Sequence, residues 1–139
     1  MYSARLVAAH TVNWYHDNDL YITNLKLQKL LYFLQWEFFK LDHQKLINEE
    51  FFAWDLGPVI PSIYKEYSIY ASSLIPKQYN IAEIDFETFE CIDKILKLYD
   101  SKTTWELVEL SHSQYPWKYI YHKYGSKSLI PFTLIANYI

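Results

Sequence analysis

Glycine is scarce in this sequence: only Gly57 and Gly125 occur among its 139 residues. At an average usage of about 7%, a chain of this length would contain roughly ten glycines. Few glycines mean few tight turns, so a turn-rich β-sandwich or β-barrel is disfavoured and a helical domain is favoured. The dinucleotide fingerprint, the phosphate-binding P-loop and the nucleophile elbow each require closely spaced glycines, and the sequence therefore excludes all three motifs.

Metal-binding and disulfide patterns are also missing. Cys91 is the only cysteine, which excludes an internal disulfide and every two-cysteine zinc arrangement and agrees with a reducing compartment. The five histidines never lie four residues apart, so the paired-histidine zinc helix is absent. The sequence therefore predicts no metal site and no cofactor.

Long apolar runs are absent as well. The longest unbroken run, Leu30–Leu34, has five residues, whereas a membrane-spanning helix needs roughly 20. The amino terminus contains one positive residue, Arg5, and its apolar stretch is interrupted by His10, so no signal peptide is recognisable. We therefore expect a cytoplasmic protein without a membrane partner.

Positive charge is limited, and most of it comes from lysine. The formal net charge is −3, and Arg5 is the only arginine among thirteen basic residues, which disfavours direct nucleic-acid binding. Charge is unevenly distributed: residues 83–109 have a local balance of −5, whereas residues 110–139 contain three lysines and no acidic side chain. An acidic face and a basic end can steer a partner protein, although ordinary solvated helix faces have the same composition.

What the sequence contains instead is a series of amphipathic helices. Apolar residues recur at helical spacing, and the capping residues Ser3, Thr23 or Asn24, Asp85 and Thr103 precede the apolar stripes. These signals predict about seven helices: residues 4–16, 24–40, 61–70 and 86–100, one that begins after Thr103, and two that begin at Pro116 and Pro131 and end near Gly125 and Ile139.

One short segment has strand character. Phe52, Trp54 and Leu56 follow a period-two pattern that predicts a small strand. The run 57–61 that follows predicts a stiff elbow, because glycine can adopt positive φ and proline restricts the residue before it. The predicted fold is all-α or mainly α, a compact single domain over residues 1–139 with at most one short strand pair near Phe52 to Leu56.

Three segments of the chain, taken together, resemble the signatures of one family. They are Ile22–Phe33 (ITNLKLQKLLYF), Phe52–Tyr64 (FAWDLGPVIPSIY), and Leu110–His112 together with Pro116-Trp117. Their order and spacing resemble those of the Panacea domain, also called the SocA-like antitoxin domain. The matching motif residues, which we expect to be mostly structural, are Lys29, Tyr32, Trp54, Gly57, Pro58, Val59, Tyr64, His112, Pro116 and Trp117.

The resemblance implies a mainly helical domain found in bacteria and phages, most often as the antitoxin half of a toxin–antitoxin pair. Members of this family neutralise small toxins by direct binding, and one resembles a proteolytic adaptor that delivers its toxin to a cytosolic AAA+ protease. Two departures are present: Tyr70-Ala71 stands where relatives often have a glycine, and Ser111 stands where they often have threonine. The chain also lacks the helix-turn-helix that some relatives carry.

These observations predict a non-enzymatic antitoxin whose partner is a cognate toxin protein. Two alternatives remain: a proteolytic adaptor with a AAA+ protease as a further partner, and a small hydrolase that uses His112 with a nearby carboxylate. The hydrolase requires a nucleophile or second acid beside His112, and no motif supplies one. No catalytic residues are therefore assigned.

Several single residues have simple structural interpretations. Trp54 is expected to be a core tryptophan, and Cys91 to pack in the core as a small apolar residue. His112 is expected to make a hydrogen bond at a helix end rather than to act as a general base. Lys26 and Lys29, on a largely apolar helix, are expected to extend their ammonium groups to water.

Aromatic residues are unusually frequent, with fourteen tyrosines among twenty-seven aromatic side chains. Each aromatic side chain buries about 150–250 Å² when enclosed, so a domain of this size must leave some of them exposed. Tyrosine is enriched at protein interfaces. The sequence therefore predicts a partner-binding surface in its basic carboxy-terminal part, formed by Trp117, Tyr119, Tyr121 and Tyr124.

Overall fold

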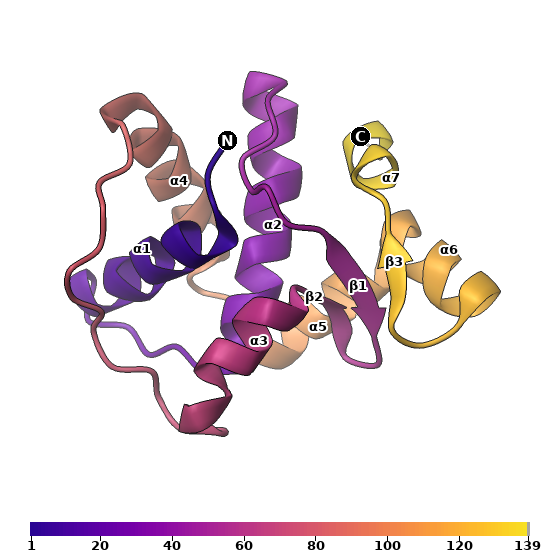
Figure 1. The fold of residues 1–139 in the computed structure, drawn as a ribbon, viewed down its shortest axis with the longest axis horizontal. Helices are drawn as coiled ribbons and strands as arrows, with labels where there is room; N and C mark the ends of the chain where they lie inside the picture. Colours follow the sequence, from indigo (N-terminus) through magenta and orange to yellow (C-terminus); the bar gives the residue numbers. More distant parts are fainter. Residues whose placement is uncertain (139) are drawn as a thin grey trace.

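Helix α2 (Asn24–Asp42) runs through the middle of the molecule, and most other elements pack around it (Figure 1). The computed structural model describes residues 1–138. The helices that contact α2 are α1 (Ala4–Asp17), α3 (Pro61–Tyr67), α4 (Phe86–Tyr99), α5 (Thr104–Ser113) and α7 (Phe132–Asn137), and α6 (Tyr115–Tyr124) packs against α5. Because α2 has neighbours on most sides, apolar residues around much of its circumference are buried, as its sequence predicts.

The helix starts agree with the predicted caps. The side chains of Ser3, Thr23, Asp85 and Thr103 each accept a hydrogen bond from a backbone N–H three residues further on, and Thr103 and Glu106 form a complete capping box. The predicted mainly α fold is confirmed. Among the described residues, no helix is long and apolar enough to cross a membrane.

The helix predicted over residues 61–70 ends earlier than expected. The α-helix stops at Tyr67, and a short 3-10 helix (Ser68–Tyr70) continues to Ala71. Ala71 has φ 51° and ψ −123°, and the Ser73 N–H donates to the Tyr70 carbonyl at 2.8 Å. These features describe a type II′ turn, whose first central position favours glycine. The glycine that relatives often carry here would fit this backbone without strain.

A small antiparallel sheet lies beside α2 and α5, formed by β1 (Phe51–Trp54), β2 (Gly57–Val59) and β3 (Ser128–Ile130) in the order β2-β1-β3. β1 and β2 form a hairpin whose turn is Asp55-Leu56, so the predicted elbow is a strand and Leu56 is a turn residue. The prediction of at most one strand pair is wrong, because β3 adds a second pair with β1. Three residues are too few to show a period-two pattern, so the sequence contains no visible signal for β3.

The last predicted helix is also shorter than expected. Pro131 precedes α7 as its N-cap residue, and α7 ends at Asn137. The predicted end at Ile139 lies outside the described residues. The single-domain prediction over residues 1–139 stays a prediction.

Residues 71–85 connect η1 (Ser68–Tyr70) to α4 without helix or strand. Side chains of α1 hold this connection: His10 and His16 donate to the carbonyls of Ala82 and Ile75, and the Asn13 amide bonds both backbone groups of Gln78. The three α1 residues are spaced by three along the helix and therefore share one face. This face orders a connection that lies outside helices and strands and makes few main-chain hydrogen bonds, among them Ile75 N–H to the Ile22 carbonyl (2.9 Å).

Candidate partner-binding site

The fold brings the three signature segments together around the β1–β2 hairpin. Lys29 and Tyr32 lie on α2, residues 54–59 form the hairpin, and the junction between α5 and α6 supplies His112, Pro116 and Trp117. Tyr32 is buried and donates a hydrogen bond to the Gln114 side chain at this junction (2.7 Å). Pro116 and Val59 are also buried. The hairpin is therefore clamped between α2 on one side and the α5–α6 junction on the other.

Lys29 is the charged residue that the structure places deepest. Its side chain is fully buried, and its Nζ atom donates a hydrogen bond to the Pro58 carbonyl at 2.6 Å. Among the described residues, no carboxylate lies within ion-pair distance of it. Burial lowers the pKa of Lys29 to about 7, because desolvation disfavours the charged form. The prediction that Lys29 extends to water is wrong, because the Pro58 carbonyl on the outer edge of β2 faces α2 and accepts the hydrogen bond from the Lys29 ammonium. Lys26 is half-buried, with its Nζ atom 5.2 Å from the centre of the Tyr15 ring.

Gly57 is required where β2 approaches α5 and Lys29. Its φ is +113°, and an added Cβ atom would lie 2.6 Å from the Ser111 hydroxyl oxygen and 3.0 Å from Lys29 Cε. The Ser111 hydroxyl is itself held by a hydrogen bond to the Val108 carbonyl (2.8 Å). Only glycine fits this backbone without displacing its neighbours. Pro58 is tolerated beside it because β2 is an edge strand, where a missing N–H does not interrupt the sheet.

Buried amides on α2 also hold backbone segments. Gln28 accepts from the Ile60 N–H (3.1 Å) and donates to Asn24, whose amide donates to the Tyr64 carbonyl (3.0 Å). Two helical turns further along α2, the Gln35 side chain makes hydrogen bonds to the backbone of the loop that precedes β1. These amides were not among the predicted site residues. The sequence feature that could have identified them is the presence of polar residues on the otherwise apolar circumference of a central helix, because buried polar groups need hydrogen-bond partners.

Trp117 is a scaffold residue. It is 6% exposed, its indole N–H donates to the Trp54 carbonyl at 2.9 Å, and its ring stacks on His112 with 4.0 Å between ring centres. His112 Nε2 donates to the Asp55 carbonyl (3.1 Å), and burial, together with the nearby charge of Lys29, lowers the pKa of His112. The interpretation of His112 as a hydrogen-bonded residue at a helix end is confirmed. The prediction that Trp117 contacts a partner at the surface is wrong, because its hydrogen bond to the Trp54 carbonyl and its stacking on His112 hold the ring in the interior.

Tyr121 also supports the hairpin. Its hydroxyl and that of Ser126 each donate to Asp55 Oδ1 at 2.8 Å, and these two bonds lower the pKa of the Asp55 carboxyl, with Ser126 the stronger influence. Tyr119 and Tyr124 lie elsewhere, beside Lys123. The predicted cluster therefore divides in two: Trp117 and Tyr121 are four residues apart and share the helix face toward the hairpin, whereas Tyr119 and Tyr124 do not.

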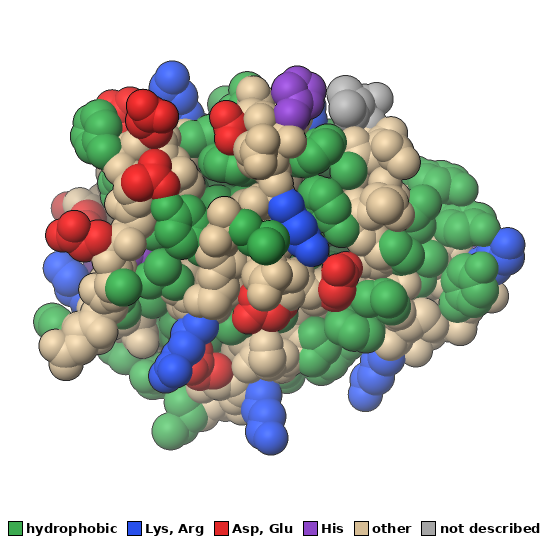
Figure 2. Space-filling view, turned by 45° about the horizontal axis from the view of Figure 1, so that its top comes forward, with side chains coloured by type: hydrophobic (Ala, Val, Ile, Leu, Met, Phe, Trp, Pro, Cys, Tyr) green, Lys and Arg blue, Asp and Glu red, His purple; other side chains and the backbone are tan. Residues whose placement is uncertain are grey.

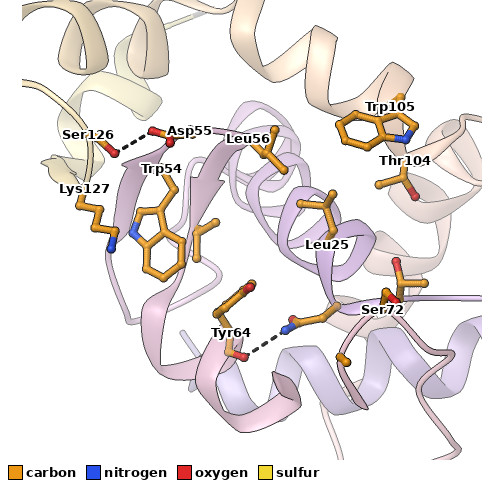
Figure 3. A pocket seen from close by; sticks show the side chains of 14 residues that line it. Leu25, Trp54, Asp55, Leu56, Tyr64, Ser72, Thr104, Trp105, Ser126 and Lys127 are labelled. Carbon is orange, nitrogen blue, oxygen red and sulfur yellow. Dashed lines mark hydrogen bonds between the residues drawn. The ribbon is translucent and has the colours of Figure 1, made fainter. Parts of the chain in front are cut away.

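An apolar groove lies on the outer side of the hairpin (Figure 3), and we call it the hairpin groove. Its volume is about 560 Å³, and its principal lining residues are Leu25, Trp54, Leu56, Tyr64, Trp105 and Lys127. Figure 3 shows the Trp54 indole between Lys127 and Tyr64, with Trp105 at the opposite end of the groove. The groove thus combines residues from α2, the hairpin, α3, α5 and the loop before β3.

Large apolar side chains remain accessible in the hairpin groove. Leu56 is 42% exposed and Trp105 is 61% exposed, while Trp54 is half-buried with its ring 5.0 Å from that of Tyr64. The Lys127 ammonium lies 5.3 Å from the centre of the Trp54 ring. The prediction of Trp54 as a core residue is wrong, because the inward side of β1 belongs to Phe51 and Ala53, and the period of two turns Trp54 outward.

Metal-binding, nucleophilic and apolar groups are distributed differently in the described residues. Within residues 1–138, no group of His, Cys, Asp and Glu is arranged to hold a metal ion. Cys91 is half-buried on α4, packs against the core, and has a pKa raised mainly by desolvation, so its thiol stays protonated. An exposed aromatic groove on a rigid hairpin can instead enclose apolar side chains of a partner.

Comparison with known proteins agrees with the segments that form this site. The family model described as "Antitoxin SocA-like, Panacea domain" matches residues 27–118. Antitoxin SocA from Caulobacter vibrioides (strain NA1000 / CB15N) is 32% identical over 115 residues, which cover 73% of this chain and 61% of that protein. The chain therefore spans less than two thirds of this relative's length, and no solved structure matches. The match over residues 27–118 shows that the chain belongs to the SocA-like, Panacea domain family.

Proposed function

We propose that this protein is an antitoxin that neutralises a cognate toxin by binding it directly in the hairpin groove. The observation that carries this proposal is the exposure of Trp54, Leu56, Tyr64 and Trp105 in one groove built largely from the segment that matches the family. The name of the relative, Antitoxin SocA, supports the antitoxin role.

The groove has the properties of a protein-binding hot spot. Binding energy concentrates in a few aromatic anchors that lie in well-packed pockets, and tryptophan and tyrosine are the residues most often found there. Three such rings line the hairpin groove. Exposed apolar side chains scattered singly need no explanation, but several in one groove indicate an interaction surface.

The hairpin is also preorganised. Its backbone is held from α2 by Lys29 and Gln28, from α6 by Trp117, and through its turn by Tyr121. A surface that is already ordered loses less conformational entropy when a partner binds. Rigid support from α2 and α6 therefore favours high affinity without any catalytic step.

The test uses the product of the open reading frame adjacent to this gene as the candidate toxin. Co-expression should rescue growth, and the two purified proteins should form a complex. Trp54→Ala should weaken the complex about 30-fold or more, because truncating an anchor costs about 2 kcal/mol or more. Leu98→Ala on α4, where the leucine is 61% exposed and outside the groove, is the matched control.

Melting curves of the same variants separate binding from folding. A folded Trp54→Ala protein with wild-type affinity would overturn the hairpin groove as the toxin site. An adjacent gene product that is not toxic when expressed alone would remove the antitoxin assignment itself.

The adaptor and hydrolase alternatives make different predictions in the same assay. Direct neutralisation requires inhibition of the purified toxin at stoichiometric ratio with no protease present, whereas an adaptor requires the AAA+ protease for toxin loss. His112→Ala should change neutralisation only through stability, because the imidazole already bonds the Asp55 carbonyl. A loss of activity by orders of magnitude in a folded His112→Ala protein would favour the hydrolase.

A further inference from the structure

A second groove lies between α6, β3 and α7, and we call it the C-terminal groove. It has a volume of about 670 Å³ and is lined chiefly by Tyr119, Ile120, Tyr124, Leu129, Pro131 and Leu134. Tyr124 is 60% exposed and Leu129 is 45% exposed. The lining starts at Tyr119, directly after the end of the family match at residue 118, so this groove is additional to the family-matched site.

The chain segment that forms this groove carries charge of one sign. Residues 110–138 contain lysines but no acidic side chain. On the exposed side of α6, the Lys123 ammonium receives support from two rings, lying 5.1 Å from the centre of Tyr119 and 5.5 Å from that of Tyr124. The Lys123 Nζ atom also donates to the Tyr119 hydroxyl at 2.8 Å. Figure 2 shows the corresponding end of the molecule covered by hydrophobic side chains and lysine, without acidic side chains.

We propose that the C-terminal groove binds an acidic amphipathic segment of a partner protein. Apolar side chains of such a segment would pack on Ile120, Leu129 and Leu134, and its carboxylates would face Lys123, whose ammonium lies over the lining rings of Tyr119 and Tyr124. Opposite charges at the rim steer the encounter, while the buried apolar contacts provide affinity. The proposal concerns a site separate from the hairpin groove and does not depend on the toxin binding there.

The lining favours a protein segment over single-stranded nucleic acid. Nucleic acid needs open aromatic faces for base stacking and a track of cations for its phosphates. Here Tyr115 and Tyr119 already stack on each other with 5.1 Å between ring centres, and the groove itself is lined by several aliphatic side chains. Residues 110–138 also contain no arginine. An amphipathic peptide matches these features better than a phosphate backbone.

The chain supplies a suitable probe: a synthetic peptide of residues 83–90 (EIDFETFE), which contains four acidic and three large apolar residues. In a titration of the whole protein followed by two-dimensional NMR, saturable shifts should be confined to α6, β3 and α7. The same peptide with its acids replaced by lysine should bind at least tenfold more weakly. Lys123→Glu should weaken binding of the acidic peptide about threefold or more, in line with the usual strength of exposed ion pairs.

Lys94→Glu, at an exposed lysine on α4, is the matched charge-reversal control and should leave the affinity unchanged. Leu129→Ser should reduce binding without changing the melting temperature, since that side chain is already partly in water. The proposal is overturned if shifts fall outside the groove, if both peptides bind equally, or if a single-stranded oligonucleotide binds there more tightly. Sedimentation completes the test: self-association that Lys123→Glu abolishes would reassign the groove to a second copy of this chain.

Discussion

The two sides of the β1–β2 hairpin have opposite compositions. Its inner side holds a buried ammonium, a hydroxyl and a glycine, from Lys29, Ser111 and Gly57, whereas its outer side presents the aromatic rings of Trp54 and Tyr64 to the surface. Globular proteins usually show the reverse, with lysine outside and large aromatics inside. Polar groups therefore hold this hairpin in place, while its apolar groups remain accessible at the surface.

The difference between the two sides arises from the position of β2 in the sheet and from its composition. It is an edge strand of three residues that contains a proline, so the sheet alone leaves its outer carbonyl and the following N–H without strand partners. Lys29 and Gln28 supply these partners from α2. A buried lysine is energetically costly, but an unpaired buried carbonyl would also be costly.

The largest expected effect is on the free energy of unfolding, and it distinguishes Trp117, which supports the hairpin, from Trp54, which lies on its outer side. Trp117→Ala should lower the free energy of unfolding by about 3–5 kcal/mol, because it removes a buried ring and the bond to the Trp54 carbonyl. Trp54→Ala should cost only about 1–2 kcal/mol, because its ring is already half-exposed. Urea unfolding of both variants measures the difference. Equal losses would break the distinction between scaffold and binding surface.

The next effect concerns the close approach on the inner side. Gly57→Ala should lower stability by about 2–4 kcal/mol, through backbone strain and overlap with the Ser111 hydroxyl. Gly125→Ala is the matched control: its φ is also positive, at +95°, but an added Cβ would meet nothing within 4 Å. The control should therefore show strain alone, about 1–2 kcal/mol. Adding Ser111→Ala should recover part of the Gly57→Ala loss, and no recovery would argue against crowding at this contact.

Lys29 gives the inner side a distinctive pH dependence. The folded pKa of about 7 lies below the ordinary value of 10.5, so between these values the unfolded chain binds more protons and stability rises with pH. The rise should amount to about 2 kcal/mol between about pH 7 and 9, at up to about 1.4 kcal/mol per pH unit.

Lys29→Met should remove this rise, and denaturant titrations at several pH values measure it. Burial raises the pKa of Tyr67 from 10.0 to about 12, so stability from that group falls as pH rises between these two values, which lie above the chosen window. A variant that retains the same slope would show that the buried ammonium is not its source.

The smallest effect is a stabilisation beside the hairpin groove. Ala71→Gly should raise the free energy of unfolding by about 1 kcal/mol, because glycine adopts the positive φ of this type II′ turn without steric conflict. Ala82→Gly, at an exposed alanine without positive φ, should instead lower stability by about 0.5–1 kcal/mol. Calorimetry of both variants tests the assignment. Toxin affinity should stay unchanged in Ala71→Gly, since the aromatic rings of the groove are retained.

Local signals were sufficient for much of the fold. The caps Thr23 and Thr103 predicted the starts of α2 and α5, because capping depends on residues only three positions apart. The period of two predicted the strand β1 but not which face of it is buried. β3 was missed because its pairing with β1 joins segments that lie far apart in the chain.

The helical class, the helix starts and the family signatures could be predicted from the sequence alone, because each depends on residues close together in the chain. Which signature residues support the hairpin and which line a groove depends on contacts that form only in the folded chain. Lys29 and Pro58 lie 29 positions apart, and Tyr121 and Asp55 lie 66 apart, so no local pattern connects them. The burial of Lys29 and the exposure of Trp54 follow from an edge strand that needs a partner from α2, and that need exists only once the chain has folded.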